Sequence, residues 1–174
     1  MNQTIQDIIT RRSCRKFTDQ MPSQEDLELI CEAGSYAATG HNTQCPIILA
    51  VTNKELIARM SKLNAQVWKV DFDPFYGAPV VLVVLADRSV SHTPVEDGSL
   101  VIGNMLLAAH SLGLGACWIN RAREVFEMPE GKQILAELGV EGDYVGVGNC
   151  IVGCPVYPPR PPKPRKEDYI RWVK

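Results

Sequence analysis

DGSLVIGNMLLAAHSLGLGACWI, residues 97–119, is the stretch of sequence that says most about the architecture. Apolar side chains lie on almost every side of a helix over residues 100–109, and a helix of this kind is buried in a core or against another subunit. Gly113 is placed to end that helix, and residues 116–119 have the composition of a strand. The order helix, glycine, strand is the reverse of a dinucleotide-binding fingerprint, which also needs a third glycine where Trp118 stands. We therefore reject a Rossmann site.

The remaining segments predict helices and strands in an irregular order. Ser23 and Asp26 form a capping box at the start of one helix, and Asn53 is the N-cap of another. The run APVVLVVLA at residues 78–86 is apolar on both faces of the period-2 pattern, so this strand should be covered on both sides. Helices are expected at residues 3–12, 24–38, 54–63, 98–112 and 129–138, and strands at residues 47–52, 78–86, 116–119 and 143–153. Because helices outnumber strands and strict βαβ alternation is missing, we expect the α+β class.

Length and composition limit the possible classes of function. A chain of 174 residues, of which 45% are hydrophobic and 22% charged, fits one globular domain over residues 1–174. A net charge of −2 argues against nucleic-acid binding, since nucleic-acid-binding domains usually carry a basic field. No apolar run approaches the roughly 20 residues of a membrane span, and residues 1–12 lack the apolar core of a signal peptide. We expect a cytoplasmic protein with no membrane partner.

The six cysteines are expected to be ordinary thiols. They form no C-x-x-C pair, and nothing in the sequence indicates a secreted protein, so disulfides are not expected. Cys150 and Cys154 stand in the sequence CIVGC, but no second Cys/His pair accompanies them, as a structural metal site would require. We therefore expect no metal.

The segment RRSCRKF, residues 11–17, concentrates positive charge. Arg11, Arg12 and Arg15 lie near the C-terminal end of the first expected helix, where the helix dipole repels anions. An anion bound there must be held by side chains alone, and guanidinium groups suit this because they are permanently charged and bidentate. The alternative is that these cations simply complement the helix dipole. The residues alone leave both interpretations open.

A family resemblance emerges when five segments are taken together in order. RRSCRKF, a capped helix, YAATGHNTQCP at residues 36–46, GLGACWI at 113–119 and KPRKEDY at 163–169 together resemble the nitroreductase family of FMN-dependent oxidoreductases. The resemblance runs through nearly the whole chain. It implies a central, mostly antiparallel sheet flanked by helices, FMN as cofactor, NAD(P)H as electron donor, and a homodimer in which an extended C-terminal tail is exchanged.

The resemblance also implies which residues hold the cofactor. The N-terminal motif would grip the FMN phosphate and ribityl chain, and a K-x-R pair in the proline-rich tail, residues 155–174, would form a second clamp. The T-G-x-N loop and its N-x-Q continuation would reach the partner's flavin, and the turn after the GLG strand would face the N5 edge of the ring. The implied cofactor residues are Arg11, Arg12, Ser13, Arg15, Ala38, Thr39, Gly40, Asn42, Gln44, Asn64, Trp118, Ile119, Asn120, Arg121, Lys163 and Arg165.

Two positions depart from the family pattern. Cys45, Pro46 and Ile47 stand where the family often has Pro-Trp after N-x-Q, so a tryptophan contact with the ring is missing. Arg121 stands in a turn where many relatives have glycine, and it would place a positive charge near the pyrimidine side of the flavin, favouring its reduced, anionic form. The alternative is that Arg121 is a surface residue at the start of the next helix.

The flavin would carry the chemistry, so no side chain is expected to act as nucleophile or general base. His41, in the flavin-side loop, and Phe75 and Tyr76, in an aromatic loop, are the candidate substrate residues, because aromatic rings suit a flat acceptor. The alternative for the aromatic loop is core packing. We expect hydride transfer through FMN to an aromatic or quinone-like acceptor by a ping-pong sequence. The competing hypotheses are a specialised relative, such as a dehalogenase or flavin-cleaving enzyme, and a non-catalytic protein that binds flavin or a phosphate ligand.

Overall fold

The computed structural model describes residues 1–174 and contains seven named helical segments and four strands. Their bounds are α1 Gln3–Thr10, α2 Gln24–Ser35, the 3₁₀ segment η1 Gly40–Asn42, β1 Pro46–Val51, α3 Lys54–Trp68, β2 Val80–Asp87, α4 Pro94–Ser111, β3 Gly115–Ile119, α5 Ala122–Glu127, α6 Pro129–Glu137 and β4 Tyr144–Gly153.

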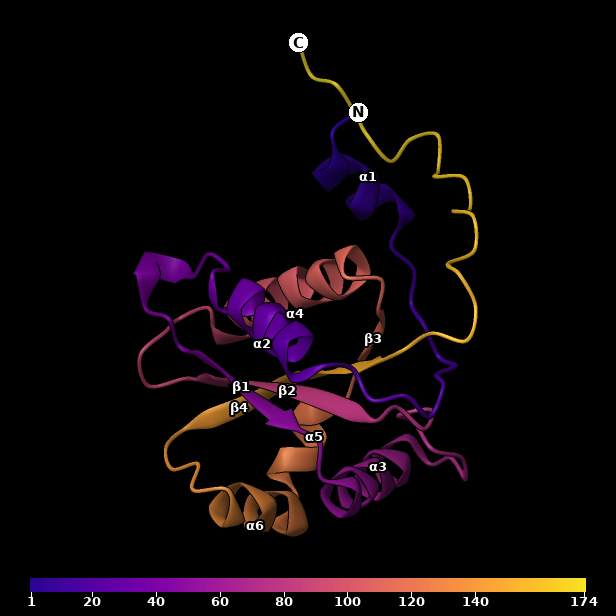
Figure 1. The fold of residues 1–174 in the computed structure, drawn as a ribbon. Helices are drawn as coiled ribbons and strands as arrows, with labels where there is room; N and C mark the ends of the chain where they lie inside the picture. The colour runs from indigo at the N-terminus through magenta and orange to yellow at the C-terminus, as the bar shows by residue number, and fades with distance from the viewer.

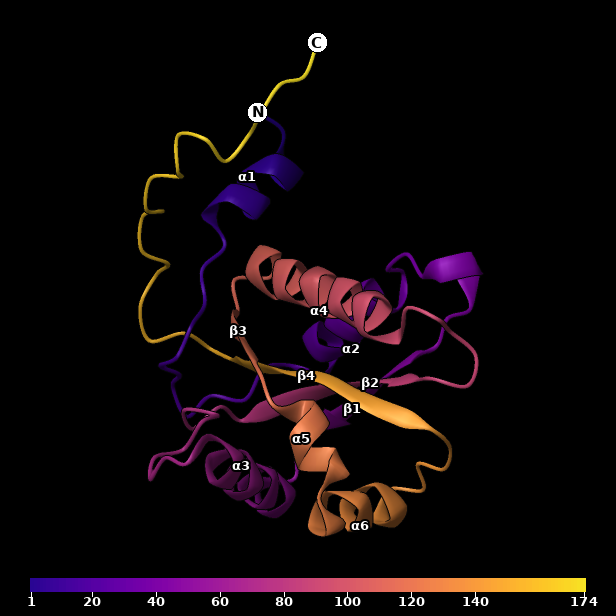
Figure 2. The same ribbon diagram turned by 180° about the vertical axis from the view of Figure 1, so that it is seen from behind.

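One open sheet lies between two layers of helices (Figure 1). The strand order is β1-β2-β4-β3, and every neighbouring pair is antiparallel. Helices α2 and α4 cover one face, and α3, α5 and α6 cover the other, as the reverse view also shows (Figure 2). The α+β class and the mostly antiparallel sheet are therefore confirmed.

Strand β2 is buried on both faces, as its continuous apolar run predicts. Val81, Val83 and Leu85 point into the core beneath α3, α5 and α6. Val80 and Leu82 alternate with them and pack beneath α2 and α4. A strand with no polar face needs a helical layer on each side, which is why the central strand fixes the three-layer arrangement.

The predicted helix signals are present. The Ser23 hydroxyl accepts a hydrogen bond from the Asp26 N–H at 3.0 Å, and Asn53 accepts one from the Leu56 N–H at 2.9 Å. Gly113 has a φ of 77°, and its N–H donates to His110 O at 3.0 Å, as a glycine that ends a helix does.

Some boundaries differ from the expectation. Helix α2 ends at Ser35 rather than residue 38, and α3 continues to Trp68 rather than ending at residue 63. Lys69 ends α3 in the left-handed conformation, with a φ of 60°, and no glycine in the sequence marks this position. Helix α4 begins at Pro94, because proline suits the first turn of a helix.

Helix α1 and the C-terminal tail extend beyond α4, away from the sheet (Figure 1). No residue of α1 is buried, and its apolar side chains Ile5, Ile8 and Ile9 are exposed. After Cys154 the chain forms no further helix or strand, and its closing Trp172 is 84% exposed. A single chain therefore leaves apolar groups at both ends without a packing surface.

No helix combines the length and the apolar character that crossing a membrane requires. All six cysteines are free thiols, and Cys45, Cys117 and Cys150 are buried.

Candidate functional site

The N-terminal motif lies beside the sheet. Ser13 forms a parallel bridge with Ala116 of β3, and the Cys14 N–H donates to Ala116 O at 2.9 Å. Phe17 forms an antiparallel bridge with Pro155, just after β4. The backbone of this segment therefore pairs with β3, the edge strand of the sheet, and the arginines of the motif lie at that edge.

Two guanidinium groups of the motif have unused donors. Arg11 Nη1 and Arg12 Nη2 are buried and have no hydrogen-bond partner. Nη1 of Arg12 donates to the Ile9 carbonyl in the last turn of α1 at 2.8 Å, so this residue does complement the helix end, as the alternative interpretation held. Its second nitrogen remains free. A buried charged donor without an acceptor is costly, so each of these two donors favours an anionic partner.

Asn64 lies at the junction of α3 and β3. It is fully buried, and its side-chain N–H donates to the Asn120 carbonyl at 2.8 Å, while its Oδ1 has no partner. The hydrogen bond fixes the turn after β3 against α3. The free Oδ1 is a buried acceptor that can take a hydrogen bond from a ligand.

Trp118 lies half-exposed across β4. A Cβ at Gly148 would come within 2.2 Å of the Trp118 Nε1 and 2.9 Å of an Ile102 methyl. Glycine at position 148 therefore makes room for the indole. Ile119, by contrast, is buried, and its carbonyl accepts a hydrogen bond from Asn149 at 3.4 Å, so its side chain is a core group.

A buried carboxylate anchors the T-G-H-N loop. The Gly40 N–H donates to Asp97 Oδ1 at 2.9 Å, and Ser91, Thr93 and Cys45 donate to the same carboxylate at 2.9, 3.2 and 3.3 Å. Burial raises the pKa of this carboxyl, but the hydrogen bonds, led by that of Gly40, outweigh burial and lower the pKa below its ordinary value of 3.8. Asp97 is therefore ionised at neutral pH and binds the loop tightly.

Left-handed backbone is concentrated in the predicted site. Six non-glycine residues have a positive φ, and all but Lys69 are among the predicted site residues. The five are His41, Asn42, Gln44, Tyr76 and Arg121. Conformations of this kind cost about 1–3 kcal/mol each and cluster at functional sites. The fold holds Gln44, Tyr76 and Arg121 in a conformation that these residue types rarely adopt, whereas Asn42 and His41 adopt it more readily.

The single chain does not bring all the predicted residues together. The loop with Ala38, Thr39 and Gly40 lies on the opposite side of the molecule from the N-terminal motif (Figure 1). Lys163 and Arg165 lie exposed in the tail, and no hydrogen bond or ion pair joins them to the motif. Arg165 donates only to the Lys163 carbonyl, at 2.8 Å for its Nη2.

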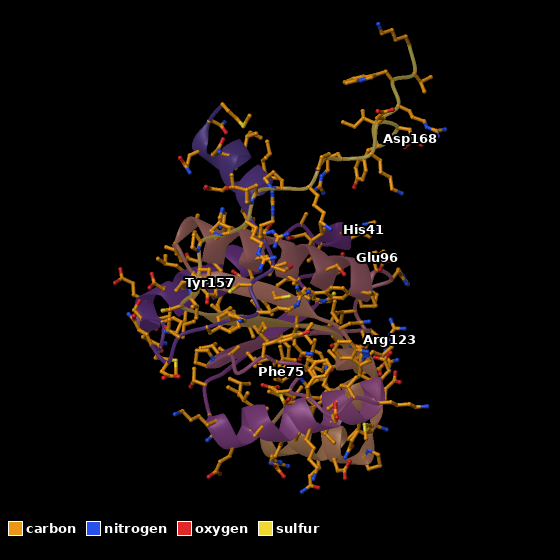
Figure 3. The ribbon with its side chains drawn as sticks, turned by 90° about the vertical axis from the view of Figure 1, so that its right-hand side faces the viewer. His41, Phe75, Glu96, Arg123, Tyr157 and Asp168 are labelled. Carbon is orange, nitrogen blue, oxygen red and sulfur yellow. The ribbon has the colours of Figure 1, made fainter.

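Phe75 was wrongly assigned to a substrate wall. It is only 1% exposed and packs in the core beneath β2 (Figure 3), so core packing accounts for it. Tyr76 is half-buried, and the Arg15 guanidinium carbon lies 5.7 Å from the centre of its ring. His41 is exposed at the tip of its loop.

The sequence reasoning missed Asp97 and Trp68. Asp97 is in the first turn of α4, where acidic residues are common, and nothing in the sequence marks its partner Gly40. Trp68 carries the Arg121 guanidinium carbon 4.1 Å from its ring centre. The sequence did contain one signal for Trp68: it lies four residues after Asn64, so the two side chains share one face of α3.

Comparisons with known proteins identify the family and the fold. A model of the "Nitroreductase family" matches residues 8–153. A protein of Archaeoglobus fulgidus, provisionally named an NADH dehydrogenase/NAD(P)H nitroreductase, is 32% identical over 142 residues, which cover 79% of this chain and 76% of that protein.

Two solved structures share the fold over the full length of both chains. A nitroreductase of Bacteroides fragilis with bound FMN is 26% identical, with a TM-score of 0.90. A nitroreductase of Desulfitobacterium hafniense with bound FMN is 28% identical, with a TM-score of 0.88.

Proposed function

The chain belongs to the nitroreductase family, and we propose that it is an FMN-dependent oxidoreductase that passes hydride from NADH or NADPH to a small aromatic or quinone-like acceptor. Four buried side-chain polar atoms have no partner: Arg11 Nη1, Arg12 Nη2, Asn64 Oδ1 and, beside the T-G-H-N loop, Thr43 Oγ1. The observation that carries the proposal is the first three of them. Two cationic donors and one acceptor fit a ligand with a phosphate at one end and ring N–H groups at the other.

The residues of this chain would hold FMN in the following way. Arg11, Arg12 and Arg15 bind the phosphate through charge-assisted hydrogen bonds, and the Ser13 hydroxyl contacts the ribityl chain. Asn64, Asn120 and Arg121 line the ring edge at the end of β3, beside Trp118. Two observations support these contacts. Buried guanidinium donors of the motif have no partner, and the left-handed conformation of Arg121 turns the backbone at the end of β3.

When bound, FMN supplies the two-electron chemistry, accepting hydride from the nicotinamide and delivering electrons to the acceptor. The protein supplies position and charge. Arg121 sets a permanent positive charge beside the ring, and its stacking on Trp68 limits its motion. No side chain needs to act as a nucleophile or to move a proton.

We propose that the working form is a homodimer. The loop carrying Thr39, Gly40, His41, Asn42 and Gln44 would complete the partner's flavin site, because in a single chain it lies far from the motif (Figure 1). Lys163 and Arg165 would reach a phosphate in the same way through the exchanged tail. His41 and Tyr76 remain the candidate substrate contacts, and a cytoplasmic location stays a prediction.

A visible absorption spectrum of the purified protein, recorded before and after addition of NADH or NADPH, tests the proposal. We expect a yellow protein whose flavin band bleaches with the reductant and returns with an aromatic acceptor. Protein that binds FMN without bleaching would instead be a flavin binder. Colourless protein that takes up no added FMN would contradict the proposal outright.

A further inference from the structure

We propose, resting on the proposed function, that Trp68, Phe72 and Tyr76 form an aromatic wall for the electron acceptor. Arg121, which stacks on Trp68, would make this wall select acceptors that are flat and negatively charged. We call these four residues the acceptor wall. We expect the acceptor wall to prefer a planar aromatic ring that bears a carboxylate over a neutral ring of the same shape.

The three rings form a continuous row. Trp68 and Phe72 meet edge to face, with 5.2 Å between ring centres and 72° between planes, and Phe72 and Tyr76 are 6.1 Å apart at 40°. Trp68 and Phe72 are exposed, 37% and 44%, although both are large apolar side chains. Exposed rings that pack on each other leave faces available to a flat ligand.

The row joins two segments of the cofactor site. Trp68 follows Asn64 by one turn of α3, and Asn64 binds the carbonyl of Asn120, the residue before Arg121. At the other end, Arg15 of the N-terminal motif lies over Tyr76. A ligand on the acceptor wall would therefore lie beside the proposed cofactor site, between the turn after β3 and the N-terminal motif.

Arg121 has no counter-ion. The three ion pairs of the structure are Arg59–Glu137, Arg88–Asp143 and Arg171–Asp168. The Asp73 carboxylate, in the same loop as Phe72, is occupied: it accepts hydrogen bonds from Ser61 and from the N–H groups of Phe75 and Gly77. That loop is shaped by Asp73 without neutralising Arg121.

The position of Arg121 favours anion recognition. Stacking on Trp68 uses the flat face of the guanidinium and leaves N–H groups at its edge for a carboxylate, which binds them in a bidentate way. The residue has a φ of 77°, a conformation that glycine adopts more readily. Arg15 is assigned to the cofactor phosphate, whereas Arg121, at the proposed ring edge, is the cation through which the protein can recognise a second ligand beside the flavin.

The test compares 4-nitrobenzoate with its neutral counterpart 4-nitrobenzyl alcohol on FMN-loaded protein. We expect the wild-type kcat/KM to favour the acid at least tenfold. Arg121→Gln should abolish this preference by raising KM for the acid about tenfold, while Arg121→Lys should retain part of it. Phe72→Leu should weaken the binding of both substrates to a similar extent, because it removes a ring face and no charge.

Arg123→Gln is the matched control, because Arg123 is exposed at the periphery (Figure 3), two residues along the chain, and belongs to no part of the acceptor wall. It should keep the preference for the acid. Equal losses for both substrates in Arg121→Gln would indicate an effect on the flavin and overturn the proposal, as would a wild-type enzyme without preference.

Calorimetric titration with 4-hydroxybenzoate and 4-hydroxybenzyl alcohol separates this inference from the proposed function, since neither compound is reduced. If the acid binds more tightly than the alcohol and Arg121→Gln removes this difference, the acceptor wall is supported even if NADH fails to bleach the protein. Bleaching by NADH together with equal binding of the two compounds would leave the proposed function standing and refute the acceptor wall.

Discussion

The Gly40 N–H donates a 2.9 Å hydrogen bond to the carboxylate of Asp97, which lies 57 residues further along the chain. The bond joins the T-G-H-N loop to the first turn of α4, and three side-chain donors complete the coordination of the same carboxylate. An ionised group with this many donors holds an otherwise unfavourable loop, in which His41 and Asn42 both have a positive φ. Asp97 is thus a positioning residue for the loop that we propose to contact the partner's cofactor.

Asp97→Asn should loosen this loop. The amide NH₂ would face a donor, so at least one buried hydrogen bond is lost, and the free energy of unfolding should fall by about 1–3 kcal/mol. Urea denaturation measures the change, and FMN retention should fall with it. Asp143→Asn, which alters an exposed carboxylate paired with Arg88, is the control and should change little.

The same variant has a defined pH dependence. Because the folded-state pKa of Asp97 is below 3.8, the ionised group contributes stability above its unfolded pKa, and this stability is lost as pH falls through the folded pKa. The stability difference between wild type and Asp97→Asn should be full at pH 7 and shrink below about pH 4. A difference that is constant from pH 7 down to pH 3 would mean that Asp97 is not the group concerned.

Local signals in the sequence predicted the fold well. The caps at Ser23 and Asn53 and the doubly buried strand β2 depend on neighbouring residues and on period, and all three are present. Contacts between distant residues were not predictable in this way. The sequence around Phe75 is the same whether the ring lines a pocket or fills the core. Phe75 is buried because it packs in one core cluster with residues of α3 and β2.

The candidate site was predictable mainly where a motif marks it. RRSCR and the N-x-Q loop are recognisable, but the partner of Gly40 and the row of Trp68, Phe72 and Tyr76 depend on how the chain folds back. The left-handed turn at Arg121 is a further case, since arginine rarely adopts that conformation and no residue preference predicts it.

Replacing Arg11 and Arg15 together with alanine should release FMN. Each lost charge-assisted hydrogen bond should cost about 1.5–3 kcal/mol of binding, so the cofactor should wash out during purification. The FMN-free variant should fold at least as well as FMN-free wild type, because Arg11 has a buried donor without a partner. Arg59→Ala with Arg88→Ala removes the same charge from the surface and should retain FMN. Stoichiometric FMN in the Arg11 and Arg15 double variant would show that the motif has another role.

Gly148→Ala should displace Trp118. The new methyl would lie 2.2 Å from the indole nitrogen, and overpacking of this kind costs about 1–3 kcal/mol. Tryptophan fluorescence should shift and FMN affinity should fall. Adding Trp118→Ala removes the obstacle, so the double variant should recover stability relative to Gly148→Ala. Simple additivity of the two stability changes would exclude a direct contact.

Steady-state kinetics should show a ping-pong pattern. The nicotinamide and the acceptor would use the same flavin face in turn, so the reductant must leave before the acceptor binds. Double-reciprocal plots at several NAD(P)H concentrations should therefore give parallel lines with 4-nitrobenzyl alcohol as acceptor. Intersecting lines would require both substrates to be bound together, which a shared face does not allow.

The chain should be active only as a homodimer whose tails are exchanged. Helix α1 buries no residue, Leu100 of α4 is exposed, and Trp172 and Val173 at the end of the tail are 84% and 96% exposed. Apolar groups at both termini and on α4 need a common surface, and an interface that covers them should exceed about 2,000 Å² in total, as obligate dimers do. The T-G-H-N loop, far from the motif of its own chain, would then meet the partner's motif.

Deleting residues 155–174 should therefore reduce FMN content and dimer stability together, because this one segment supplies the cations Lys163 and Arg165 and the exposed apolar side chains of Trp172 and Val173. Trp172→Ser should weaken the dimer first, whereas Lys163→Ala with Arg165→Ala should lower FMN affinity and leave the dimer intact, since both side chains are charged and exposed. Sedimentation velocity at micromolar concentration, with FMN absorbance recorded in the same run, separates the two effects. Two-fold symmetry predicts two equivalent FMN molecules per dimer. An active, FMN-loaded monomer of the full-length chain would show that the exposed apolar groups have another partner.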